Sequence, residues 1–483
     1  MKELATGRLA RTRQSLQSAT PEIIQVLGQI YVQKVQAWQS ALSAGNANNA
    51  VMDAMEASLL AIKILRRLLI AGYEFPNRDS DVHQFWQLTS NQVGSFIDII
   101  SSQSASIPSE IMVLVEKHLL QLSKLHLEMA KTHPAAFVLL PDSIHLVLGY
   151  WSLIKQFGET FGSKSAITSP LAESGDDRNE QKSSLEKLTL KGMLLIRACI
   201  KMVFNPTQTF KYRHPQEKEE KAQATTAMKE QLLSQSFVQE LMEVVVTKFF
   251  VFRESDLREW EEDPEEWEQS MESEGEGFEY SVRPCAEKLF LDLSINFKDL
   301  LIQPLLAVFR SVATPENENI LFKDSVYTAI GLAAAVLHQQ LDFNSFLAST
   351  LVAEVQKQAP GYKILRRRIA ILIGQWITIQ VSDENRSLVY KIFQHLLDSA
   401  DTCNDEVVRV TAGRQFKNVV DDWEFKAEQF LPYAEMTMAR LMKLIEEVEL
   451  TETKMALLNT ISVLVERLEH HVCIVTLLCR TKN

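Results

Sequence analysis

The chain has 483 residues and a formal net charge of −12, and this length exceeds what one compact core supports, so it predicts several domains or one extended repeat array. Glycine and proline number only 16 and 14, while 46% of the residues are hydrophobic, which is typical of a long helical protein and argues against disorder and an all-β fold. Five scattered cysteines without a CxxC pair, and no apolar run of the ~18 residues that a membrane helix needs, argue against a disulfide framework, a zinc site and membrane insertion.

The negative charge is concentrated in one segment. Between Glu254 and Glu279 thirteen residues are acidic and one is basic, so this segment accounts for the whole net charge of −12. A local acidic surface favours a basic protein partner and argues against direct binding of nucleic acid.

Apolar residues recur at steps of three or four along most of the chain, which predicts helices. Thr20-Pro21-Glu22 has the pattern of a helix start, with a cap and a proline in the first turn. Asn404-Asp405-Glu406 predicts a second helix start. Four apolar faces predict further helices at Met55 to Leu69, ending near Gly72, Leu233 to Val245, Val326 to Val336 and Leu365 to Trp376.

Pairs of such helices follow one another at the ~40 to 47 residue spacing of HEAT-type repeats, which predicts about ten or eleven hairpins. One hairpin cannot bury both of its faces, so neighbours stack and present a large concave surface. The predicted fold class is therefore an all-α HEAT-repeat solenoid, a superhelix of stacked helical hairpins.

Three segments interrupt the helical pattern and define the expected organisation. We expect HEAT-like repeats at 1–161, a flexible loop at 162–184, repeats at 185–253 with an exposed loop at 205–221, an acidic tryptophan-containing loop at 254–280, and repeats at 281–483.

No catalytic or cofactor-binding motif is present: there is no GxSxG elbow, no GxxxxGK[ST] phosphate loop, no GxGxxG and no HExxH. The ten histidines do not form a constellation with nucleophiles or carboxylates. We therefore expect a protein that is not an enzyme and has no cofactor.

The acidic segment has two readings. A run of like charges is often a solvated loop, but the tryptophans suggest docking, and clustered carboxylates capture basic partners. The candidate contact residues of this loop are Glu259, Trp260, Glu261, Glu262, Asp263, Glu265, Glu266, Trp267 and Glu268.

Arg366, Arg367 and Arg368 follow Lys363 and form the sharpest basic cluster. Three successive helical positions span about 200° of the circumference, so at most two can share an exposed face. The cluster is a candidate contact site, a structural helix start or an internal partner of the acidic loop.

Several ordered blocks resemble the importin beta (karyopherin) family of nuclear transport receptors, especially its importin eleven branch and the fungal counterpart of that branch. They are YSVRPCAEKLF (280–290), KDSVYTAIGLAA (323–334), YKILRRRIAILIGQWI (362–377), VDDWEF (420–425) and QFLPY (429–433). The resemblance extends over nearly the whole chain.

The resemblance implies HEAT repeats, binding of RanGTP, carriage of basic protein cargo and contact with phenylalanine-glycine nucleoporins. It also implies a receptor that shuttles between nucleus and cytoplasm and gathers at pores of the nuclear envelope, and we expect a monomer. In this family an acidic loop in the middle of the solenoid contacts Ran or cargo, and Trp260 to Trp267 corresponds to it.

The resemblance further implies that the chain is truncated at both ends, with Met1 after the N-terminal Ran-binding repeats and Asn483 before the C-terminal half. A static HEAT-repeat scaffold without a GTPase cycle is the alternative function.

Overall fold

The computed structural model describes residues 10–102, 107–161, 184–204, 215–273, 277–359 and 361–468. These residues form helices and turns and contain no strand, so the predicted all-α class is confirmed. The chain divides into two compact units, one of Met1–Phe157 with Asp176–Phe237 and one of Gly158–Gly175 with Val238–Asn483.

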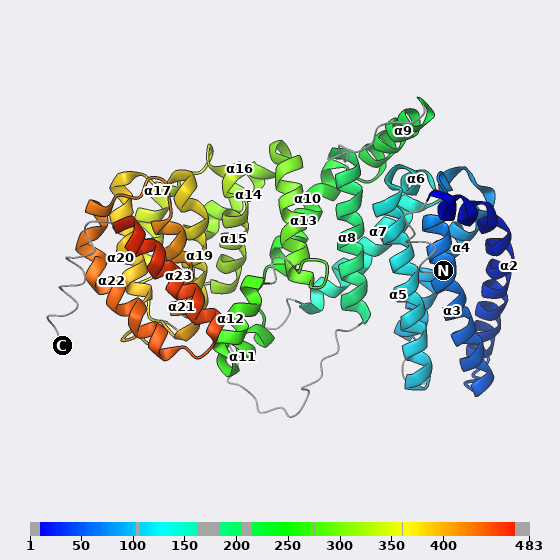
Figure 1. Cartoon of the computed structure of the whole chain (residues 1–483), viewed down its shortest axis with the longest axis horizontal. Helices are drawn as coiled ribbons and strands as arrows, with labels where there is room; N and C mark the ends of the chain where they lie inside the picture. The colour runs from blue at the N-terminus through cyan, green and yellow to red at the C-terminus, as the bar shows by residue number, and fades with distance from the viewer. Residues whose placement is uncertain are drawn as a thin grey trace. The chain divides into compact units, whose positions relative to one another are not determined.

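The first unit is built from hairpins of long helices (Figure 1). Its elements are α2 (Ala10–Ser43), α3 (Asn49–Ala71), the 3-10 turn η1 (Pro76–Arg78), α4 (Ser80–Ser102), α5 (Ser109–Thr132), α6 (Pro134–Leu139), α7 (Ser143–Phe161), α8 (Ser184–Phe204) and α9 (Pro215–Gln231). Helices α3, α5 and α8 pack in succession and form a buried row. The α3 helix begins at its cap Asn48, whose side chain accepts from the Val51 amide at 3.1 Å, and ends before Gly72, as expected.

The second unit continues the same plan. Its elements are α10 (Gln235–Val244), the π-helical η2 (Val245–Phe249), α11 (Glu254–Glu262), α12 (Pro264–Ser273), α13 (Val282–Asn296), α14 (Lys298–Val312), α15 (Ile320–Leu332), α16 (Ala334–Leu337), α17 (Phe343–Phe346), η3 (Leu347–Leu351), α18 (Val352–Glu354), α19 (Tyr362–Gln380), α20 (Asp383–Leu396), α21 (Glu406–Val420), α22 (Ala427–Glu447) and α23 (Thr451–Leu468). Helices α15, α19, α21 and α23 pack in succession as an inner row, while α20 and α22 pack on one another beside it.

The inner row has a core of fully buried apolar side chains because each helix is covered by neighbours on both sides. On α19, Leu365, Ile369, Leu372 and Trp376 are all 0% exposed, so the predicted apolar face is confirmed. The predicted start of α21 is also confirmed, because Asp405 accepts a hydrogen bond from the Val408 amide at 3.2 Å.

Three expectations about local structure need comment. The helix start predicted at Thr20 is wrong, because α2 runs through Pro21 and the Thr20 hydroxyl donates to the Leu16 carbonyl at 2.6 Å within the helix. The exposed loop expected at 205–221 is helical from Pro215 onward, since proline suits the first turn of a helix; residues 205–214 lie outside the described residues. The flexible loop expected at 162–184 also lies outside them, apart from Ser184, which begins α8.

Candidate interaction site

The acidic segment expected as a loop at 254–280 forms two short helices, α11 and α12. The start of α11 is fixed by the buried Asp256, which accepts from the Arg253 amide at 2.8 Å and also pairs with the side chains of Arg253 and Arg283. Burial raises the pKa of Asp256, but the two guanidinium groups outweigh it and lower that pKa to about 2. These two cations, both outside the acidic run, allow a chain segment rich in like charges to fold.

Trp260 and Trp267 are buried at 2% and 3% exposure, so neither presents its ring to a partner. Their ring centroids lie 4.9 Å apart, and Phe252 contacts both. The Trp260 indole nitrogen donates to a carboxylate oxygen of Asp405 at 2.7 Å. The expectation that these tryptophans bind a partner protein is therefore wrong. They instead pack α11 and α12 against the start of α21 within the same chain.

Two of the candidate carboxylates also bind within the chain. Glu265 accepts hydrogen bonds from the backbone amides of Glu449 and Leu450, just before α23 begins. This arrangement suits the positive end of a helix dipole. Glu268 lies 3.0 Å from the Arg414 guanidinium on α21. Both side chains are buried, at 8% and 2% exposure, and they attach α12 to the inner row.

The remaining candidate carboxylates of α11 and α12 are exposed. We call the following five residues the outer acidic face: Glu259, Glu261, Glu262, Asp263 and Glu266. Glu261 lies 2.9 Å from Lys363 on α19, and this lysine is also 3.6 Å from Asp405. The face therefore combines clustered negative charge with a rigid base, which favours an oppositely charged protein surface.

The three successive arginines of α19 have different surroundings, as expected from their angular spread. Arg366 is fully buried and pairs with Asp401 at 3.0 Å, so it has a structural role in the fold. Arg368 pairs with Asp324 at 2.7 Å. Arg367 lies over the Trp267 ring, 4.8 Å from its centroid. Three alternatives were open for this cluster. Arg367 fits the third, because it contacts Trp267 of the acidic segment within the same chain.

Sequence reasoning did not identify the residues that receive α11 and α12. Asp405 was expected only as a helix cap, and Arg283 and Arg414 were not singled out. The two tryptophans could have indicated this docking. Tryptophan is usually buried, so two of them in an acidic run predict that another part of the chain covers them.

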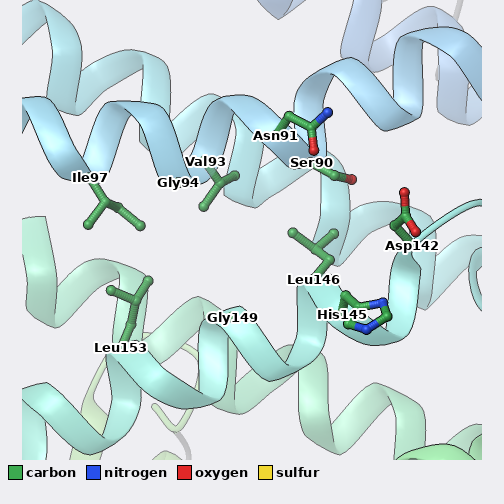
Figure 2. Close-up of a pocket in the computed structure, with 10 residues that line it drawn as sticks. All are labelled: Ser90, Asn91, Val93, Gly94, Ile97, Asp142, His145, Leu146, Gly149 and Leu153. Atoms are coloured by element: carbon green, nitrogen blue, oxygen red, sulfur yellow. The ribbon is translucent and has the colours of Figure 1, made fainter.

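A second candidate site lies in the first unit, between α4 and α7 (Figure 2). A cavity of about 360 Å³ is lined by Val93 and Ile97 from α4 and by Leu146 and Leu153 from α7. Glycines flank it on both helices, and a Cβ added to Gly94 or Gly149 would meet nothing within 4 Å. The cavity is therefore open and mainly apolar, and its size suits an aromatic side chain.

Within the described residues, no group of three or more His, Cys, Asp or Glu side chains could hold a metal ion. Across the same residues, no helix is long and apolar enough to cross a membrane.

The stacked hairpins, with two acidic helices packed on the inner row, define an α-solenoid of the HEAT type. The chain is 30% identical over 471 residues to the importin beta-like protein KAP120 of Saccharomyces cerevisiae, a match that covers 96% of this chain and 43% of that protein. It is 29% identical to importin-11 of Mus musculus and 28% identical to importin-11 of Homo sapiens, in each case over 96% of this chain and 45% of the relative.

Among solved structures, the chain is similar to Lph2, described as a bidirectional nuclear transport receptor of S. cerevisiae, with a TM-score of 0.81 and 26% identity over 96% of this chain and 43% of that one. No family model matches. The resemblance to the importin beta family is confirmed: the chain is a homologue of importin beta-like proteins, and it spans less than half the length of these relatives.

Proposed function

We propose that this chain is part of a nuclear transport receptor that carries basic protein cargo through the nuclear pore under the control of the GTPase Ran. The observation that carries the proposal is the outer acidic face, held on a rigid base in a homologue of importin beta-like proteins. The receptor would shuttle between nucleus and cytoplasm and gather at nuclear pores.

Electrostatics supports a basic partner. The five carboxylates of the outer acidic face lie within eight residues, with Lys363 as a nearby cation. Such clustering speeds the encounter with a Lys- and Arg-rich surface and weakens as salt screens the charges. A nuclear localisation segment and a basic surface of Ran are both suitable ligands.

RanGTP would regulate cargo binding because Ran and cargo share the same solenoid. When Ran and cargo bind the same solenoid and disfavour one another, each lowers the affinity of the other by the same factor. RanGTP would therefore release cargo.

The α4–α7 cavity supports contact with phenylalanine-glycine nucleoporins. A phenylalanine ring would bury its apolar surface against Leu146 and Leu153, while Gly94 and Gly149 leave room for the adjoining backbone.

The test is a pull-down with Ran loaded with GTP or GDP, in the presence of a Lys- and Arg-rich cargo peptide, of this chain and of the same chain extended to the length of its relatives. Because this chain spans less than half of those relatives, selective binding of the GTP form with loss of the peptide is expected of the extended protein. A peptide complex of the extended protein that does not respond to RanGTP would favour the static scaffold instead.

A further inference from the structure

A small pocket lies beneath α12 in the second unit, between that helix and the inner row. Its volume is about 150 Å³, and Trp267 of α12 and Arg367 of α19 both line it. None of the roles described above uses this space.

The pocket contains one guanidinium group without a carboxylate partner. Three arginines line the pocket, but Arg283 pairs with Asp256 and Arg368 pairs with Asp324. Among the described residues, Arg367 forms no ion pair, and its Nε is buried without a hydrogen-bond acceptor. Burial, together with the neighbouring Arg368, lowers the pKa of Arg367 to about 10, which still leaves it charged at neutral pH.

Two glutamine side chains add neutral donors. Gln375 of α19 lies over Gly331 of α15, where an added Cβ would come within 1.9 Å of its Oε1. Gln415 of α21 lies over Gly374 of α19 in the same way, at 2.3 Å. The glycines therefore make room for a ladder of amides across three successive helices, and both amides line the pocket.

The charge and the shape together define the ligand. Glu287 and Asp324 line the pocket and Asp256 pairs with Arg283, so the attraction for an acidic group comes from Arg367, the lining arginine that forms no ion pair among the described residues. Leu332, Ile371 and the Trp267 ring make part of the wall apolar. A bare inorganic anion would leave this wall uncovered, whereas a glutamate side chain brings methylene groups next to its carboxylate.

We propose that this pocket binds an acidic side chain of a protein partner, with the carboxylate on Arg367 and the amides of Gln375 and Gln415. This proposal rests on the proposed function, because it assumes that the chain binds a protein partner. The region around α12 would then recognise two features of that partner: its basic surface and an acidic residue beside it.

The test uses the whole chain and two acetylated, amidated pentapeptides, one with a central glutamate between leucines and one with glutamine in its place. Isothermal calorimetry should show that the glutamate peptide binds about tenfold more tightly, the difference that a charge-assisted hydrogen bond supports. Arg367→Met should abolish this difference. Arg310→Met, which removes an exposed arginine of the same unit, should leave it unchanged.

Thermal unfolding gives an independent measure of binding. Arg367→Met removes the guanidinium group from the Trp267 ring, so some loss of stability is expected whether or not the pocket binds a ligand. The glutamate peptide should raise the unfolding temperature of the parent but not that of Arg367→Met. A peptide-induced increase of the same size in both proteins would overturn the proposal. Equal binding of the two peptides, or tighter binding of inorganic phosphate, would also overturn it. RanGTP binding is measured separately, so failure here is distinguishable from failure of the receptor function.

Discussion

The indole of Trp260 and the carboxylate of Asp405 join positions 145 residues apart, with a donor-to-acceptor distance of 2.7 Å. Asp405 is at the same time the N-cap of α21. One carboxylate thus starts a helix of the inner row and fastens the acidic helices to it.

Replacing Asp405 should therefore lower the free energy of unfolding by more than the loss of a helix cap alone would. We expect Asp405→Ala to lower the free energy of unfolding by about 2 kcal/mol, since a cap contributes ~1 kcal/mol and a hydrogen bond to a charged group at least as much. Urea denaturation followed by circular dichroism measures this. In a double-mutant cycle, Trp260→Phe keeps an aromatic side chain and removes the donor, and a coupling near zero would mean that the hydrogen bond does not stabilise the fold.

The ion pair between Lys323 and Glu354 should be sensitive to removal of one partner. Both side chains are 0% exposed and lie 2.6 Å apart, and Tyr327 donates a further hydrogen bond to Glu354 at 3.0 Å. Lys323→Met leaves the carboxylate buried without its cation and should destabilise the chain by about 3 to 5 kcal/mol. The double variant with Glu354→Gln should recover part of the loss in the same urea titration, and a double variant as unstable as the single one would contradict this.

Asp256 should give a pH dependence of stability. Because Arg283 and Arg253 lower its folded pKa to about 2, below the ordinary 3.8, its ionised form stabilises the fold above that ordinary value. This contribution, about 2 kcal/mol, should be lost as the pH falls from about 4 towards 2. Asp256→Asn should remove the loss, so the stability difference between parent and variant shrinks on acidification. A difference that is constant between pH 5 and pH 2.5 would be inconsistent with the ion pairs.

Helices α15, α19 and α21 of the inner row are indicated by the sequence pattern, whereas the docking of α11 and α12 could not be predicted. The apolar face of α19 and the cap of α21 depend on residues within a few positions of one another, which periodicity detects. Glu265 binds an amide 185 positions away, and Glu261 binds Lys363 at a separation of 102, and nothing in the local pattern encodes such pairing.

The same limit explains why the acidic segment was expected as a loop. Like charges within it repel, and the cations that offset them, Arg283, Lys363 and Arg414, belong to other helices. Only the folded arrangement shows that Glu265 and Glu268 are buried while the outer acidic face is exposed.

The α4–α7 cavity can be closed without disturbing the core. Gly94→Glu and Gly149→Glu each add a side chain where the space is open, and replacing a helical glycine also removes a helix penalty of up to ~1 kcal/mol. We expect both variants to lose binding of a phenylalanine-glycine nucleoporin peptide in fluorescence anisotropy, with stability unchanged or raised. Gly28→Glu on α2, also in open space, is the matched control. Equal binding by all three variants would exclude the cavity as the site.

The most direct measurement is the affinity of the chain for a Lys- and Arg-rich nuclear localisation peptide after neutralising the outer acidic face, with Glu259, Glu261, Glu262 and Glu266 changed to Gln and Asp263 to Asn. The matched control changes five exposed glutamates of the same unit to Gln: Glu316, Glu318, Glu384, Glu428 and Glu446. We predict that the first variant binds at least about tenfold more weakly and loses most of its salt dependence, while the control changes by less than about twofold, because only close charges act directly on the partner. Equal weakening in both variants would show that net charge alone attracts the peptide and would contradict the assignment of this face as the binding site.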